Sequence, residues 1–157
     1  MADRRILAAM AALPLLAGAH RLDPAFAGAW RIDCSVVAPW ATLSETDAQE
    51  ARSLPGKRVN FASGMVSGPP PLACSPPRYS VRRDDGPDML FQGMLASTDS
   101  SGHERNARAL ARGLGMATAT VATLDPGCGA VEFHAIRPGT LAFALNNRIY
   151  FLRRLGK

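Results

Sequence analysis

The last thirty residues of the chain, 128–157, constrain the fold more than any other stretch. They consist of short runs of β-branched, aromatic and aliphatic residues, separated by Pro138-Gly139 and by Asn146-Asn147. Apolar runs broken by such turns are typical of antiparallel hairpins. The stretch therefore predicts a meander of strands, and we expect the core to form against it.

The two-residue loop Asn146-Asn147 also sets a register, because it places Phe143 opposite Tyr150. Side chains directly opposite each other lie on the same face of a sheet. One face then carries Leu141, Phe143, Leu145, Tyr150 and Leu152, and the other carries Ala142, Ala144, Ile149 and Phe151. Since both faces are apolar, both must be covered, one by the interior of a barrel or sandwich and the other by an amphipathic helix.

Residues 102–114 are predicted to form that helix. Ser101 and Glu104 have the spacing of a capping box at its start. The apolar residues at helical spacing are Ala107, Leu110, Ala111 and Leu114. The basic residues on the remaining surface are Arg105, Arg108 and Arg112. They could bind an anionic partner, but we favour a solvated charged face.

Strand patterns also occur in the first two thirds of the chain. Trp30, Ile32, Cys34 and Val36 alternate with polar residues, which predicts a strand with these four side chains inward. Further strands are predicted at 57–61, 64–68, 78–82, 90–95 and 118–124, and a short surface helix or loop at 42–54. The expected fold is mainly β: an antiparallel meander of about eight or nine strands forming a small barrel or half-barrel, with one packed amphipathic helix.

The first 27 residues have the features of a secretory signal peptide. Arg4-Arg5 precede an apolar run of about a dozen residues that ends in small residues, and this run is too short for a membrane span. Cleavage after Ala19 or after Ala27 fits the small-x-small rule. We therefore expect a signal peptide at 1–27, a single β-rich domain at 28–157, a periplasmic or secreted location, and no transmembrane segment after cleavage.

Three cysteines in an exported chain suggest one disulfide and one free thiol. Cys74 lies in a proline-rich loop and Cys128 in a Pro-Gly turn, where the two can approach freely, whereas Cys34 is predicted to be buried on a strand. Three pairings are possible, and we favour Cys74–Cys128. The histidines and cysteines do not have the spacing of zinc ligands, so no metal or cofactor is expected.

The opening Gly28-Ala29-Trp30 resembles the start of the calycins, the lipocalin-like β-barrels. Proteins of that type place a basic residue from the end of the barrel over this tryptophan. The resemblance implies that Arg153 or Arg154 could contact Trp30 by a cation–π interaction. It also makes Trp30, Arg153, Arg154, Tyr150 and Phe143 the candidate residues for closing the barrel or binding a ligand.

A second set of residues resembles the META domains of bacterial heat-shock and envelope proteins. The matching positions are Val59, Phe61, Val66, Gly68, Cys74, Tyr79, Thr123 and Cys128, while Ala73-Cys74-Ser75 replaces the Gly-Cys-Asn of that family. This resemblance implies a small exported β-rich domain that acts as an accessory envelope protein.

The charge and the motifs argue against nucleic-acid binding and catalysis. The chain has 18 Lys and Arg against 13 Asp and Glu, but the arginines are scattered and have no aromatic residues among them, so nucleic acid is not an expected partner. Glu45 and Asp47 suit the first turn of a helix better than an acid/base pair. Glu132 and His134 share the predicted polar face of their strand without a nucleophile beside them. We therefore do not expect an enzyme.

These observations predict an exported, monomeric, non-catalytic accessory protein of the envelope. Its expected partner is a small apolar ligand or another envelope protein. The alternative is an inhibitor of a secreted hydrolase, either a protease or a lysozyme, because small disulfide-linked barrels also serve that role.

Overall fold

The structure is a computed structural model that describes residues 21–42, 45–97, 99, 101–116, 120–129 and 131–156. Most of the predicted signal peptide, residues 1–20, lies outside the described residues. The described strands are β1 (Gly28–Val37), β2 (Arg58–Ala62), β3 (Met65–Ser67), β4 (Ser80–Asp85), β5 (Thr120–Asp125), β6 (Phe133–Arg137), β7 (Thr140–Leu145) and β8 (Arg148–Arg154). The helices are α1 (Glu45–Ser53), α2 (Ala107–Gly113) and the short 3₁₀ helix η1 (Pro87–Met89).

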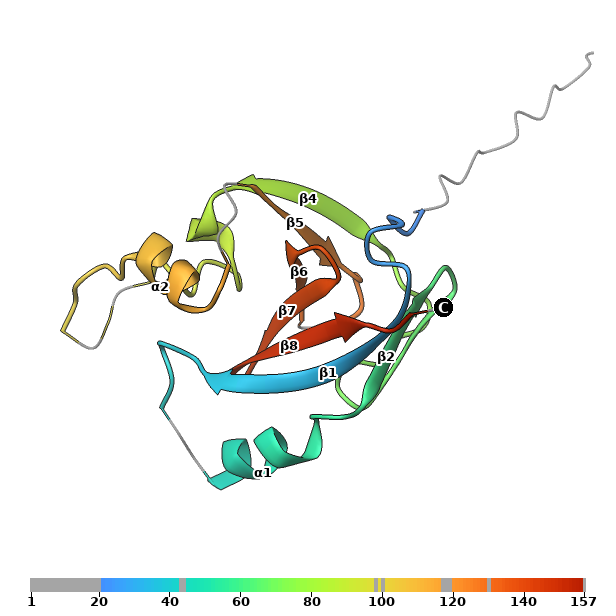
Figure 1. The fold of residues 1–157 in the computed structure, drawn as a ribbon, viewed down its shortest axis with the longest axis horizontal. Helices are drawn as coiled ribbons and strands as arrows, with labels where there is room; N and C mark the ends of the chain where they lie inside the picture. The colour runs from blue at the N-terminus through green and yellow to red at the C-terminus, as the bar shows by residue number, and fades with distance from the viewer. Residues whose placement is uncertain are drawn as a thin grey trace, which may run out of the picture.

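All eight described strands belong to one antiparallel sheet with the order β3-β2-β1-β8-β7-β6-β5-β4. The sheet curls into a half-barrel, which brings β2 round towards β4 (Figure 1), and its two edge strands are β3 and β4. The predicted fold class is therefore confirmed. Apart from the pairing of β1 with β8, neighbouring strands follow one another along the chain, as expected for a meander.

The predicted register of the C-terminal hairpin is confirmed. Phe143 pairs with Tyr150, and Leu141 pairs with Leu152. Their face of the sheet forms the inner core, and the opposite face, which includes Ala142 and Ile149, forms a second buried cluster. Helix α2 contributes Ala107, Ala111 and Leu110 to that second cluster, so it covers the outer face of the sheet as predicted.

The expectation that Cys34 points inward is wrong, because β1 contains a β-bulge. Ile32 pairs with Leu152, but the next pair along the ladder is Cys34 with Phe151. The extra residue, Asp33, shifts the alternation by one position. Trp30 and Ile32 remain in the inner core. Cys34 and Val36, which were also expected to point inward, lie on the outer face, where Val36 packs against the second cluster and Cys34 is an exposed free thiol.

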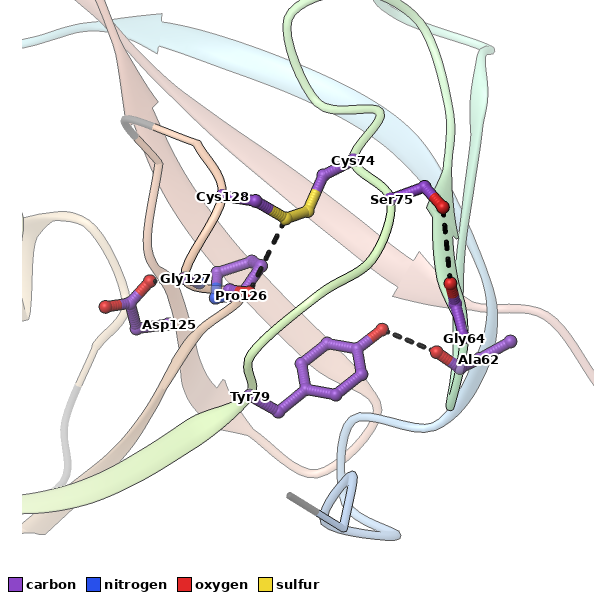
Figure 2. Close-up of a disulfide and its surroundings, with 9 residues drawn as sticks. All are labelled: Ala62, Gly64, Cys74, Ser75, Tyr79, Asp125, Pro126, Gly127 and Cys128. Carbon is purple, nitrogen blue, oxygen red and sulfur yellow. Dashed lines mark hydrogen bonds between the residues drawn. A yellow bond between two sulfur atoms is a disulfide. The ribbon is translucent and has the colours of Figure 1, made fainter. Parts of the chain in front are cut away.

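The gap between β3 and β4 is bridged by the segment that connects these two strands. Cys74 pairs with Val66 of β3 and forms the predicted disulfide with Cys128. The hydroxyl of Tyr79 donates a 2.7 Å hydrogen bond to the carbonyl of Ala62, which ties the start of β4 to the β2–β3 hairpin (Figure 2). These contacts close one side of the half-barrel without a continuous strand ladder.

Gly127 allows the turn that carries Cys128. Its φ is +69°, and a Cβ at this position would lie 2.6 Å from the carbonyl oxygen of Arg78. A side chain could not fit there without displacing the backbone that leads into β4. The proximity of Cys128 to Cys74 therefore depends on a glycine at position 127.

The predicted strand at 90–95 and the predicted capping box are both wrong. Residues 90–95 form turns with hydrogen bonds between residues three apart, such as that from the Gly93 amide to the Leu90 carbonyl. Helix α2 starts later than expected, with Asn106 as N-cap accepting a hydrogen bond from the Ala109 amide. Strand β4 is also longer than expected, because it includes Asp85.

We predict that replacing both Cys74 and Cys128 by serine lowers the free energy of unfolding by about 4 kcal/mol. The disulfide joins residues 54 positions apart, and the chain-entropy model gives about this value for a loop of that length. Urea denaturation without reductant measures the difference. Cys34→Ser is the matched control and should change stability by less than about 0.5 kcal/mol, because Cys34 is exposed. Equal stability of the double variant and the wild type would contradict the prediction.

Candidate functional site at the mouth of the half-barrel

Two neighbouring rows of inward side chains differ sharply in size. One row crosses neighbouring strands through Leu124, Phe133, Phe143 and Tyr150. The rings of Phe143 and Tyr150 are stacked, with centroids 5.0 Å apart. In the other row, Arg83 of β4 pairs with Ala122, Ala122 pairs with Ala135, and Ala135 pairs with Leu141. The first row fills the half-barrel, whereas the two alanines of the second row leave space above them.

That space is a recess of about 410 Å³ at the end of the sheet where β1 begins and β8 ends. We call this recess the mouth. Its apolar floor and walls include Ala122, Ala135, Leu141 and Trp30. Its basic side chains are Arg83, Arg137 and Arg154. The mouth therefore combines an apolar surface with several guanidinium groups.

Arg154 lies over the ring of Trp30, with its guanidinium carbon 4.3 Å from the ring centroid. The strand ladder brings them together, since Trp30 of β1 pairs with Arg154 of β8. This is the contact that the calycin resemblance implied, and Arg154 rather than Arg153 provides it. Because Trp30 is only 1% exposed, the cation covers the edge of the inner core.

Residues 21–27, which we call the strap, pack against the same end of the half-barrel. Phe26 of the strap is fully buried in the inner core, and its carbonyl accepts a 2.8 Å hydrogen bond from the Trp30 indole. The guanidinium of Arg154 donates to the Ala27 carbonyl at 2.8 Å and also to the Ala25 carbonyl. Figure 1 shows this blue segment on the right of the view, between β2 and the start of β4.

The mouth carries net positive charge. The side chain of Arg83 is 66% exposed and forms an ion pair with Asp23 of the strap at 3.6 Å. In the described part of the chain, neither Arg137 nor Arg154 forms an ion pair with a carboxylate. The carbonyls that bind Arg154 satisfy its N–H groups but do not neutralise its charge. The mouth therefore attracts anions.

Phe143 and Tyr150 were predicted as ligand-binding or barrel-closing residues, and both lie deep in the filled part of the interior. Burial raises the pKa of Tyr150 to about 12, and the nearby carboxylate of Glu50 in α1 adds to this effect. Burial also raises the pKa of Tyr79, although its hydrogen bond to Ala62 opposes the shift. Phe143 and Tyr150 thus support the wall behind the mouth and do not line it.

Arg153 lies on the outer face, where its guanidinium pairs with Asp33 at 2.8 Å.

Helix α1 is the predicted surface helix, and Asp47 lies in its first turn as expected. Asp47 is nevertheless only 6% exposed, and it accepts a 2.8 Å hydrogen bond from Asn147. Helix α1 therefore anchors the β7–β8 turn, at the end of the sheet opposite the mouth.

Glu132 and His134 lie on the outer face of the sheet, but His134 is fully buried rather than solvated. Its Nε2 accepts a 3.1 Å hydrogen bond from the Phe91 amide, and its Nδ1 lies 2.9 Å from the Thr123 hydroxyl. Glu132 forms a bidentate ion pair with Arg82, with distances of 2.6 and 2.7 Å. Both side chains therefore have structural partners within the fold.

The sequence interpretation missed Arg83, Ala122, Ala135 and Phe26 at the mouth. Ala122 and Ala135 were assigned to strands, but their small size at inward positions was the available signal for a recess. Arg83 was placed beyond the end of a strand that the structure extends to Asp85. Phe26 was assigned to the predicted signal peptide, so the sequence did not indicate that its side chain packs in the core.

Comparisons with protein-family models, curated proteins and solved structures find no match to the chain. In the part of the chain that the structure describes, no helix has the length and apolar character needed to cross a membrane. The same described residues contain no group of three or more His, Cys, Asp or Glu side chains placed to hold a metal ion.

We predict that Arg154→Met lowers the free energy of unfolding by about 2 kcal/mol, because it removes the cation–π contact and the hydrogen bonds to the strap. Arg153→Met is the matched control. It removes an exposed ion pair of the adjacent residue and should change stability by less than about 0.5 kcal/mol. Chemical denaturation of both variants measures the difference, and equal effects would refute a special role for Arg154.

Proposed function

We propose that this protein is an exported, non-catalytic binding protein that takes a small amphipathic anion at the mouth. The observation that carries the proposal is the recess above Ala122 and Ala135, which joins an apolar floor to the guanidinium groups of Arg83, Arg137 and Arg154. An apolar body would cover the alanines and Leu141, and an anionic head would meet the arginines.

The filled interior supports the mouth as the binding site. Phe133, Phe143 and Tyr150 are each at most 1% exposed, so they occupy the space that a ligand would take in a hollow barrel. The proposal therefore changes the expected ligand from an apolar molecule in the interior to an amphipathic anion at the rim. Inhibition of a secreted hydrolase stays an alternative prediction.

Octanoate is the probe for this proposal, and 1-octanol is its neutral counterpart. We predict that octanoate binds and shifts the NMR signal of the Trp30 indole, and that octanol binds more weakly. Arg83→Gln should weaken octanoate binding about tenfold, because a charge-assisted contact is lost. Ala135→Leu should strongly weaken binding, because the larger side chain occupies part of the apolar floor.

Arg58→Gln is the control for the arginine variant, since Arg58 is also exposed but does not line the mouth. It should leave octanoate binding unchanged. Equal binding of octanoate to the wild type and to Ala135→Leu would refute the site. Equal binding of octanoate and octanol would refute the requirement for an anionic head.

The proposed export rests on the leader-like sequence of residues 1–19 and is supported by the Cys74–Cys128 disulfide, which fits an oxidising compartment such as the periplasm. The packing of the strap favours the first of the two cleavage sites. Cleavage after Ala27 would remove Phe26 from the inner core, and loss of a buried phenylalanine costs about 3–5 kcal/mol.

We therefore predict that the exported protein begins at His20 and retains the strap. Intact mass and N-terminal sequencing of protein recovered from the periplasm or the medium measure this directly. A mature chain that begins at Gly28 and is as stable as a chain that begins at His20 would contradict the structural role of Phe26.

A further inference from the structure

A second recess, of about 260 Å³, lies on the outer face of the sheet and is separate from the mouth. It is bounded by the turn after η1, by the β7–β8 turn and by Trp40, which follows β1. We call it the outer recess. The lining residues that matter here are Trp40, Phe91, Gln92, Met94, Glu132 and Asn146.

The turn that forms one wall has an unusual backbone. Phe91, Gln92 and Gly93 have φ values of 53°, 58° and 81°, so three consecutive residues adopt the left-handed conformation. Only glycine adopts it readily. Phe91 is held in place by its burial and by the hydrogen bond from its amide to His134. Gln92 is exposed, and burial of its side chain therefore does not explain its conformation.

Gln92 lines the outer recess together with Asn146, whose side-chain nitrogen donates a hydrogen bond to the Glu50 carboxylate, which leaves the Asn146 Oδ1 as an acceptor. Strained conformations of residues other than glycine concentrate at functional sites. A side-chain amide offers both a donor and an acceptor, which suits a hydroxyl group that can also do both. The rim of the recess is thus equipped for a neutral polar ligand.

The outer recess has no net charge with which to select an ion. The carboxylate of Glu132 is neutralised by its bidentate pair with Arg82. The imidazole of His134 accepts a hydrogen bond at Nε2, so this nitrogen carries no proton and the ring is neutral. The chemistry of this recess therefore differs from that of the mouth, where the arginines favour an anion.

Aromatic rings supply the apolar part of the outer recess. The rings of Trp40 and Phe91 have centroids 5.8 Å apart and are inclined by 48°. A flat aromatic ligand could stack between the two rings only if they were parallel, and at 48° they are not. Phe91 is also buried, which leaves the half-buried Trp40 as the platform for a ligand. A puckered ring with C–H groups on its face fits such a single platform.

From the neutral lining, the aromatic platform and the two amides, we propose that the outer recess binds the pyranose ring of a neutral saccharide. The apolar face of the ring would lie on Trp40, and its hydroxyl groups would hydrogen-bond to the Gln92 amide and donate to the Asn146 Oδ1, because the Asn146 nitrogen already donates to Glu50. The volume suits one ring, and a ligand of that size is expected to bind with a dissociation constant on the order of 1 mM.

The test uses methyl β-glucopyranoside, whose hydroxyl groups are all equatorial and leave both ring faces apolar. Sorbitol is the control ligand, because it has similar hydroxyl groups but no ring. In the full-length protein, titration to about 20 mM should shift the NMR signal of the Trp40 indole and leave that of Trp30 in place. Sorbitol should shift neither signal.

Two variants separate binding from folding. Trp40→Leu should weaken saccharide binding at least tenfold, as measured by saturation transfer to the ligand. Gln92→Gly should weaken it about fivefold through loss of one hydrogen bond, while its Tm should not fall, because glycine adopts the left-handed conformation without strain. Met89→Ala is the control, since Met89 is 53% exposed and lies outside the outer recess.

Three results would overturn the proposal. One is an unmoved Trp40 signal at the highest saccharide concentration. Another is equal saccharide binding by the wild type, Trp40→Leu and Gln92→Gly. The last is a shift of the Trp40 signal by octanoate as large as that by the saccharide, since this would show that the outer recess does not prefer a neutral ring.

Discussion

Both faces of the β6–β7–β8 meander are apolar, and each face needs its own cover. The inner face is covered by the curl of the sheet itself, which brings Phe61 of β2 into edge contact with Phe133 of β6 at 4.8 Å. The outer face is covered by α2 and by the turn after η1, which contribute Ala111, Leu90 and Leu95. The two recesses lie where these covers end: the mouth at the rim of the curled sheet, and the outer recess at the rim of the outer cover.

The C-terminal meander could be predicted in detail because its signals are local. A two-residue turn and strict alternation are enough to pair Phe143 with Tyr150. The errors occurred where distant contacts decide the structure. The bulge at Asp33 depends on the partner strand, and it moved Cys34 to the outside. The apolar run 90–95 forms turns instead of a strand, with its Phe91 amide bonded to His134. The sequence predicted that a basic residue contacts Trp30. It did not predict the recess beside them, because that recess forms only when β4, β5 and β6 pair and bring Ala122 and Ala135 next to Arg83.

Polar side chains serve mainly to position backbone segments in this protein. His134 holds the left-handed turn at Phe91, Asn147 holds helix α1 through Asp47, and Arg154 holds the strap. The bonds of His134 and Arg154 each connect an irregular segment to a strand of the sheet, and the bond of Asn147 connects the β7–β8 turn to α1. Because the strands are rigid, such bonds fix the irregular segments that border the two recesses, namely the strap at the mouth and the turn after η1 at the outer recess.

The strap and the last strand meet although Arg154 and Ala27 are 127 residues apart in sequence. Strand β1 also takes β8 as a neighbour, so the centre of the sheet joins the two ends of the chain. A chain that is synthesised from its N-terminus cannot complete this sheet until nearly all of its residues have left the ribosome. Strand β1 therefore lacks one of its two neighbours through most of synthesis, although β2 can already pair with it.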